Sequence, residues 1–189
     1  AIALGNRNGR VAYAQTGGPH HVIGRGSMTT IGVYDTTRRH TLGTITNLTG
    51  YCGSLAWSSD NQFLLSFSTV DDPSLGWRSR IDVWQAPQLT HVTTLTNFPR
   101  RPDGGEGFVR FAANADASAI AIASTARLLS VRNVATGATN WSLASEHRGF
   151  EELALAPDGR TLFAIEDADP GRIRVLDFLT GKELSPPLV

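Results

Sequence analysis

A five-residue strand pattern recurs four times along this chain. Each copy has a branched aliphatic residue, a variable residue, a valine, a large or apolar residue and a side chain with a carbonyl oxygen; the copies span residues 31–35, 81–85, 129–133 and 173–177. The four valines, Val33, Val83, Val131 and Val175, are 50, 48 and 44 residues apart. A period of this length is typical of a propeller blade, a unit of four short antiparallel strands. Because one blade cannot bury both of its faces alone, the period predicts an all-β fold of four consecutive four-stranded antiparallel blades.

The period divides the chain into blades of about residues 1–46, 47–97, 98–144 and 145–189 of a single propeller segment. The last blade is the clearest, with strands expected at 152–156, 161–165, 172–177 and 182–188 and a tight turn at Asp158-Gly159. The same turn chemistry is found at Asn8-Gly9, Asp60-Asn61 and 114–116. The other strands are expected at 2–4, 10–15, 30–35 and 41–45, at 54–58, 63–69, 80–85 and 91–96, and at 108–112, 119–124, 128–133 and 140–143.

The balance of charges argues against nucleic acid or a membrane surface as the partner. The chain has 17 basic and 17 acidic residues, so it has neither the basic surface of a nucleic-acid-binding protein nor a polybasic membrane patch. No apolar run is long enough to span a membrane, and no signal peptide is recognisable, so we expect a soluble protein and leave its localisation open. The chain starts at Ala1, which indicates a processed product or an excised piece. Cys52 is the only cysteine, which excludes an internal disulfide and is expected to be a buried, inert thiol.

The last blade resembles a known repeat family. His147-Arg148-Gly149, the run 153–162, the strand 173–177 and Thr180-Gly181-Lys182 together resemble a WD40 repeat, and also the related YVTN and lactonase-like bacterial propeller repeats. The resemblance implies a structural hydrogen bond from His147, with Asp167 or Asp169 at the acidic position of the second loop. The family's tryptophan in the third strand is present only as Trp84. The other three blades match mainly at their first and third strands.

Four blades are fewer than the six to eight that WD40-like rings usually hold. An open arc would expose two apolar blade faces, which favour association. Three outcomes are open: two copies close an eight-bladed ring as a homodimer, a separate chain supplies the missing blades, or those blades were cut away. We expect completion by another copy or another chain.

Three long connections are expected on the same face of the propeller, at residues 16–29, 70–79 and 97–107. Long loops on a rigid scaffold concentrate binding residues, and tryptophan and arginine are enriched at binding hot spots. The candidates for binding a protein or peptide partner are Trp77, Arg78, Arg100, Arg101, His20, His21 and Arg25.

No residues are assigned to catalysis or metal binding. Adjacent histidines such as His20 and His21 rarely direct both rings at one ion, and the pairs Asp71-Asp72 and Glu151-Glu152 are expected to form a solvated rim. The sequence has no nucleophile elbow and no phosphate-binding glycine motif, so we expect no cofactor. The favoured function is a non-catalytic scaffold that binds a protein or peptide; the alternatives are part of a lactonase-like hydrolase and a structural module that assembles through its blade faces.

Overall fold

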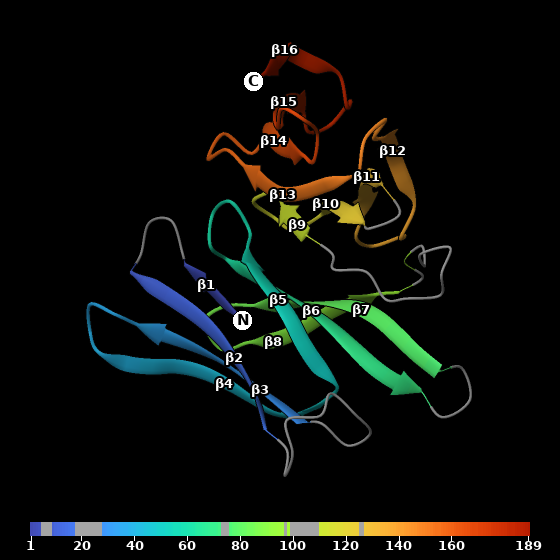
Figure 1. The fold of residues 1–189 in the computed structure, drawn as a ribbon. Helices are drawn as coiled ribbons and strands as arrows, with labels where there is room; N and C mark the ends of the chain where they lie inside the picture. The colour runs from blue at the N-terminus through green and yellow to red at the C-terminus, as the bar shows by residue number, and fades with distance from the viewer. Residues whose placement is uncertain (5–8, 18–27, 73–75, 97, 99–109, 125–126) are drawn as a thin grey trace. The chain divides into compact units, whose positions relative to one another are not determined.

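The computed structural model describes the 189-residue chain except for residues 5–8, 18–27, 73–75, 97, 99–109 and 125–126 (Figure 1). The chain divides into two compact units: unit 1 is Ala1–Trp57 with Asn61–Asn97, and unit 2 is Ser58–Asp60 with Phe98–Val189. Each unit contains two four-stranded antiparallel sheets, in which the strands lie in chain order. The prediction of an all-β fold with four consecutive four-stranded antiparallel sheets is therefore confirmed. We call these sheets blades 1 to 4.

Unit 1 contains blades 1 and 2. Blade 1 consists of β1 (Ile2–Leu4), β2 (Arg10–Gly17), β3 (Met28–Asp35) and β4 (His40–Thr49). Blade 2 consists of β5 (Tyr51–Trp57), β6 (Phe63–Asp72), β7 (Gly76–Gln85) and β8 (Thr90–Leu95).

Unit 2 contains blades 3 and 4. Blade 3 consists of β9 (Arg110–Ala113), β10 (Ala119–Ser124), β11 (Leu128–Asn133) and β12 (Thr139–Ala144). Blade 4 consists of β13 (Phe150–Leu155), β14 (Thr161–Glu166), β15 (Arg172–Asp177) and β16 (Glu183–Leu188). No helix among the described residues has the length and apolar character needed to cross a membrane.

The repeated valine lies on one face of each blade, and we call this the valine face. It carries the first and third residues of the repeat pattern, and the opposite, reverse face carries the fourth. In unit 1, Ile31 and Val33 on the valine face of blade 1 share a buried cluster with Leu64 and Trp84 on the reverse face of blade 2. Neighbouring blades of the unit therefore pack valine face against reverse face.

Unit 2 repeats this packing with different side chains. Leu129 and Val131 on the valine face of blade 3 form one cluster with Leu162 and Leu176 on the reverse face of blade 4. The second strand of blade 3, β10, contributes alanines to this cluster and is buried along its whole length. Small residues on one blade thus accommodate large residues on the next.

The outermost strand of one blade contacts the second turn of the next in both units. In unit 1, Gly43 on β4 approaches the turn of blade 2 so closely that a Cβ there would clash with the Pro87 carbonyl oxygen. In unit 2, Trp141 on β12 occupies the same repeat position, donates from Nε1 to the Phe178 carbonyl oxygen at 2.8 Å, and lies against Gly181. The glycine is on the strand in one pair and on the turn in the other.

Positive backbone φ angles recur at two turns of every blade. The last residues of the second turns, Arg39, Leu89, Gly137 and Gly181, have φ between 57° and 71°. In the first turns the positive φ is at Gly9, Asn61, Ala117 and Gly159. The prediction that residues 114–116 supply this conformation in blade 3 is wrong, because Ala117 adopts it. Asn114 instead stabilises the turn, since its Oδ1 accepts the Ala119 N–H at 3.0 Å.

Candidate functional site

The second long connection is a hairpin. Residues 70–79 are predicted as a loop, but β6 and β7 remain paired as far as Asp72 opposite Gly76, and only 73–75 lie outside the described residues. The prediction of a loop is therefore wrong over most of its length. The reason is local: strand-forming residues at the end of β6, such as Thr69 and Val70, keep the ladder regular.

This hairpin extends past its neighbours in blade 2. In the described residues, the pairing of β5 with β6 ends at Thr69 and that of β7 with β8 ends at Ile81. Residues 70–72 and 76–80 therefore form a two-stranded ribbon, which is visible at the far ends of β6 and β7 (Figure 1). We call it the projecting hairpin.

The structure describes two of the candidate binding residues, both in the projecting hairpin. Arg78 is exposed and lies opposite Val70 in the register. Trp77 lies opposite Asp71, with a backbone that belongs to β7, but its side chain is outside the described part of the chain. The candidates His20, His21, Arg25, Arg100 and Arg101 also lie outside the described residues.

The first long connection also begins and ends in paired strands. β2 and β3 stay in register through Gly17 opposite Met28, so the prediction of a loop from Thr16 to Thr29 is wrong at both ends. The two threonine hydroxyls are 2.9 Å apart, and the Thr29 hydroxyl donates to the Gly50 carbonyl oxygen at 2.8 Å. These bonds tie the base of the connection to the turn between blades 1 and 2.

A buried carboxylate, Asp82, lies among polar groups on β7 and β8. Its Oδ2 is 2.9 Å from Arg80 Nε, and its Oδ1 accepts the Thr94 hydroxyl at 2.6 Å. His91 Nε2 is 3.0 Å from the Thr94 hydroxyl and 3.6 Å from Asp82 Oδ1. Because the hydroxyl donates to the carboxylate, His91 is not its proton acceptor, and these contacts stabilise the strand pair rather than activate a nucleophile.

Trp84 extends this network into the blade. Its Nε1 donates to the Ser66 hydroxyl at 2.9 Å, and its ring meets the His91 ring edge-on with centroids 5.0 Å apart. The repeat pattern did not point to this cluster. An acidic residue between Ile81 and Val83, two fully buried positions of the repeat, was the signal that could have revealed it.

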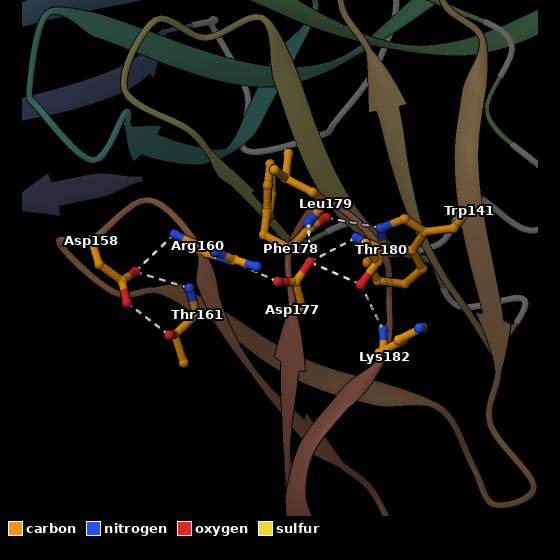
Figure 2. A network of polar contacts seen from close by, with 9 residues as sticks. All are labelled: Trp141, Asp158, Arg160, Thr161, Asp177, Phe178, Leu179, Thr180 and Lys182. Atoms are coloured by element: carbon orange, nitrogen blue, oxygen red, sulfur yellow. Dashed lines mark hydrogen bonds and ion pairs between the residues drawn. The ribbon is translucent and has the colours of Figure 1, made fainter.

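The carbonyl-bearing residue that ends the third strand organises the second turn in blades 1, 3 and 4, and Figure 2 shows the turn of blade 4. In blade 4, Asp177 Oδ1 accepts the N–H groups of Leu179 and Thr180 at 3.1 and 2.8 Å. Asp177 Oδ2 is 2.8 Å from Arg160 Nε. The bond from Arg160, followed by those from Thr180, lowers the pKa of Asp177 from 3.8 to about 2. Asp35 and Asn133 accept backbone N–H groups at the same repeat position, so this element of the pattern is structural.

The first turn of blade 4 has a similar carboxylate. Asp158 accepts the N–H groups of Arg160 and Thr161 at 2.7 and 2.9 Å and the Thr161 hydroxyl at 2.7 Å (Figure 2). The N–H groups of Thr161 and Arg160 lower the pKa of this carboxyl below its ordinary value. Arg160 thus bridges two turns, with its N–H on Asp158 and its guanidinium on Asp177.

The second strand of blade 4, β14, ends in a buried carboxylate, Glu166. This side chain accepts the Ser145 hydroxyl at 2.6 Å, and the Ser145 oxygen in turn accepts the His147 N–H at 3.0 Å. Asp167 is half-buried, and Asp169 is exposed. The bond between the Glu166 carboxylate and the Ser145 hydroxyl therefore holds the connection that leads into β13. The repeat resemblance indicated Asp167 or Asp169 as the acidic residue here, and not Glu166.

The single cysteine is buried, as predicted. Burial raises the pKa of the Cys52 thiol to about 11, and its Sγ is 3.5 Å from the Ser54 carbonyl oxygen. A thiol in this state is a poor nucleophile at neutral pH. Over the described part of the chain, no three His, Cys, Asp or Glu side chains are grouped as metal ligands would be.

Comparisons with known proteins found no match for this sequence, either among protein-family models or among curated proteins. The fold and the geometry of its own residues are thus the basis for a functional proposal.

Proposed function

We propose that this chain is a non-catalytic scaffold of WD40-like or YVTN-type propeller repeats that binds a protein or peptide partner. The observation that carries the proposal is the projecting hairpin. It holds Trp77 and Arg78 on the part of β7 that lies past the pairing with β8. A rigid blade that presents such a ribbon suits recognition rather than chemistry.

The projecting hairpin favours an extended peptide as the bound form. In the described residues, the named strands beside β6 and β7 end their pairing at Thr69 and Ile81. The backbone groups beyond these points are placed to pair with a strand of another molecule. The exposed Arg78 adds a planar donor that matches carboxylate or carbonyl oxygens on the partner.

The buried charged groups elsewhere support a structural reading of the blades. Asp82, Glu166 and Asp177 each accept a hydroxyl or a backbone N–H within their own blade or its connection. Their bonds hold strands and turns together. The described acidic groups inside the blades thus serve the scaffold, and recognition is assigned to the projecting hairpin.

The test is a selection of peptides on the purified chain. It compares the natural chain with a shortened variant in which residues 70–78 are replaced by a two-residue Asn-Gly turn. This replacement leaves Thr69 opposite Ser79, so it keeps the register of β6 and β7 but removes the projection. We expect the selected peptides to bind the natural chain and to bind the shortened variant at least about tenfold more weakly. A tenfold loss of affinity corresponds to ~1.4 kcal/mol of binding free energy.

A matched pair of arginines refines this test. Arg78→Ala is expected to weaken the same peptides, whereas Arg148→Ala, in the connection that leads into β13 and also exposed, is expected to leave them unchanged. Equal affinity for the natural and shortened chains would contradict the proposal. Hydrolysis of a lactone by the purified chain would favour the hydrolase alternative instead.

A further inference from the structure

The reverse face of blade 1 is exposed at positions that other blades bury. Ile2 and Leu4 on β1 are 71% and 73% exposed. Ile2 lies opposite Tyr13 and Leu4 opposite Val11 in the register, as Leu55 and Trp57 lie opposite their partners on β6. These two residues of blade 2 are only 7% and 9% exposed.

The valine face of blade 4 is also exposed at positions that other blades bury. The first residue of the repeat pattern is fully buried in blades 1, 2 and 3, as Ile31, Ile81 and Leu129, but Ile173 in blade 4 is 37% exposed. Ile165, its partner on β14, is 39% exposed. Unit 1 thus exposes apolar residues on the reverse face of blade 1, and unit 2 exposes apolar residues on the valine face of blade 4.

The packing inside each unit identifies what fits these faces. In unit 1 the valine face of blade 1 is covered by a reverse face, and in unit 2 the valine face of blade 3 is covered by a reverse face. The exposed valine face of blade 4 therefore fits a reverse face, and blade 1 of a second copy presents one. We infer that two copies of this chain bind head to tail, with blade 4 of each against blade 1 of the other.

The size of the side chains at the outermost strand agrees with this pairing. Where this strand carries Gly43, the facing turn ends in a larger residue, Leu89, and where it carries Trp141, the facing turn ends in Gly181. Blade 4 has the small residue Ser185 at this position, opposite Val175. The turn of blade 1 that would face it ends in a large residue, Arg39, at a φ of 57°.

A front-to-back contact of this kind joins copies into a ring when its rotation closes and into a filament when it does not. The inferred pair is the closed form, in which the exposed face of blade 1 and the exposed face of blade 4 are covered in both copies by two equal contacts.

The test uses one charged variant for each face. Ile2→Glu with Leu4→Glu alters the reverse face of blade 1, and Ile165→Glu with Ile173→Glu alters the valine face of blade 4. Val92→Glu is the matched control, because Val92 is also an exposed apolar residue but lies at the irregularity of β8. Circular dichroism and cooperative melting establish whether each variant is folded. If a double variant does not fold, a single variant replaces it: Leu4→Glu for the face of blade 1 and Ile173→Glu for the face of blade 4.

Sedimentation of the variants distinguishes this arrangement from others. We expect the natural chain and the Val92 variant to have the mass of two chains, and each face variant alone to have the mass of one. A mixture of the two face variants should regain two-chain species, because one natural contact is restored. A natural chain with the mass of one chain or of more than two, face variants that still pair alone, or a mixture that does not pair would each overturn the inference.

Chemical cross-linking tests the register of the contact. Ser185→Cys in one copy and Arg38→Cys in the other are expected to be joined by a short bismaleimide, as Gly43 and Gln88 are neighbours within unit 1. Cys52 is buried, with a pKa raised to about 11, so it does not compete for the reagent. Cross-links at no more than the rate given by Val92→Cys in place of Ser185→Cys would overturn this register.

Discussion

Replacing Gly181 by alanine tests the contact between blades 3 and 4. Gly181 has a φ of 71°, and a Cβ there would lie 2.7 Å from Cδ2 and 2.9 Å from Cε3 of Trp141. The indole cannot move aside without cost, because its Nε1 donates to the Phe178 carbonyl oxygen at 2.8 Å (Figure 2). Gly181→Ala is therefore expected to strain the turn and to push Trp141 off it.

Gly137 provides the matched control for the cost of placing a residue with a Cβ at a positive φ. It ends the second turn of blade 3 with a φ of 69°, and a Cβ there would meet nothing within 4 Å. Both substitutions place an L-residue in the left-handed region, which costs roughly 1–2 kcal/mol. Only Gly181→Ala adds overpacking, typically about 1–3 kcal/mol. The free energy of unfolding should thus fall by about 1–3 kcal/mol more for Gly181→Ala than for Gly137→Ala.

Urea unfolding followed by circular dichroism measures this difference. A Trp141→Ala background completes the cycle, since without the indole Gly181→Ala should cost no more than Gly137→Ala. If the two glycine variants are equally stable when Trp141 is present, the indole does not lie on this turn, and the account of how neighbouring blades fit is refuted.

Three further predictions concern single side chains. Cys52 should resist thiol reagents at pH 8 in the folded chain and react on unfolding, because burial raises its pKa to about 11; rapid labelling of the native chain would contradict this. Because the pKa of Asp177 is lowered in the folded chain, this carboxylate stabilises the fold at pH values above 3.8, the ordinary pKa of the group. The contribution is lost as the pH falls toward 2. Asp177→Asn should therefore flatten the loss of melting temperature between about pH 4 and pH 2. Ser145→Ala removes a 2.6 Å bond to the buried Glu166 and should cost about 1.5–3 kcal/mol in urea unfolding, whereas an unchanged midpoint would show that the bond contributes nothing.

The sequence was sufficient to locate the third strand of each blade, for a physical reason. The valine and the branched residue of each repeat are strand formers that occupy one face, so their period locates the third strand of each blade. The strands Ala119–Ser124, Leu128–Asn133 and Arg172–Asp177 are as predicted. The carbonyl-bearing residue was part of the pattern, and the structure shows its role in the second turn.

Other features depend on contacts that the sequence does not contain. Thr69 and Val70 favour a strand, but the sequence does not show that β7 pairs with β6 as far as Asp72 and Gly76, so this connection was interpreted as a loop. Ala117 adopts a positive φ in the turn that the bond from the Ala119 N–H to Asn114 Oδ1 closes. The complementarity of Trp141 and Gly181 links residues 40 positions apart, so it becomes visible only when the two blades are placed together.

The binding role of the candidate residues stays a prediction. The sequence located the connection in blade 2 that holds Trp77 and Arg78, and the structure shows it as a projecting hairpin with Arg78 exposed. Nothing in the strand pattern marks Glu166, the last residue of β14, as a buried carboxylate, because its burial depends on its partner, Ser145, in the connection that leads into β13.

The solution mass of the unmodified chain over a wide range of concentration tests the central claim most directly. Sedimentation equilibrium should give twice the 20.3 kDa of one chain, with no larger species at high concentration. A mass of 20.3 kDa at every concentration would contradict the claim that a second copy covers Ile2, Leu4 and Ile173.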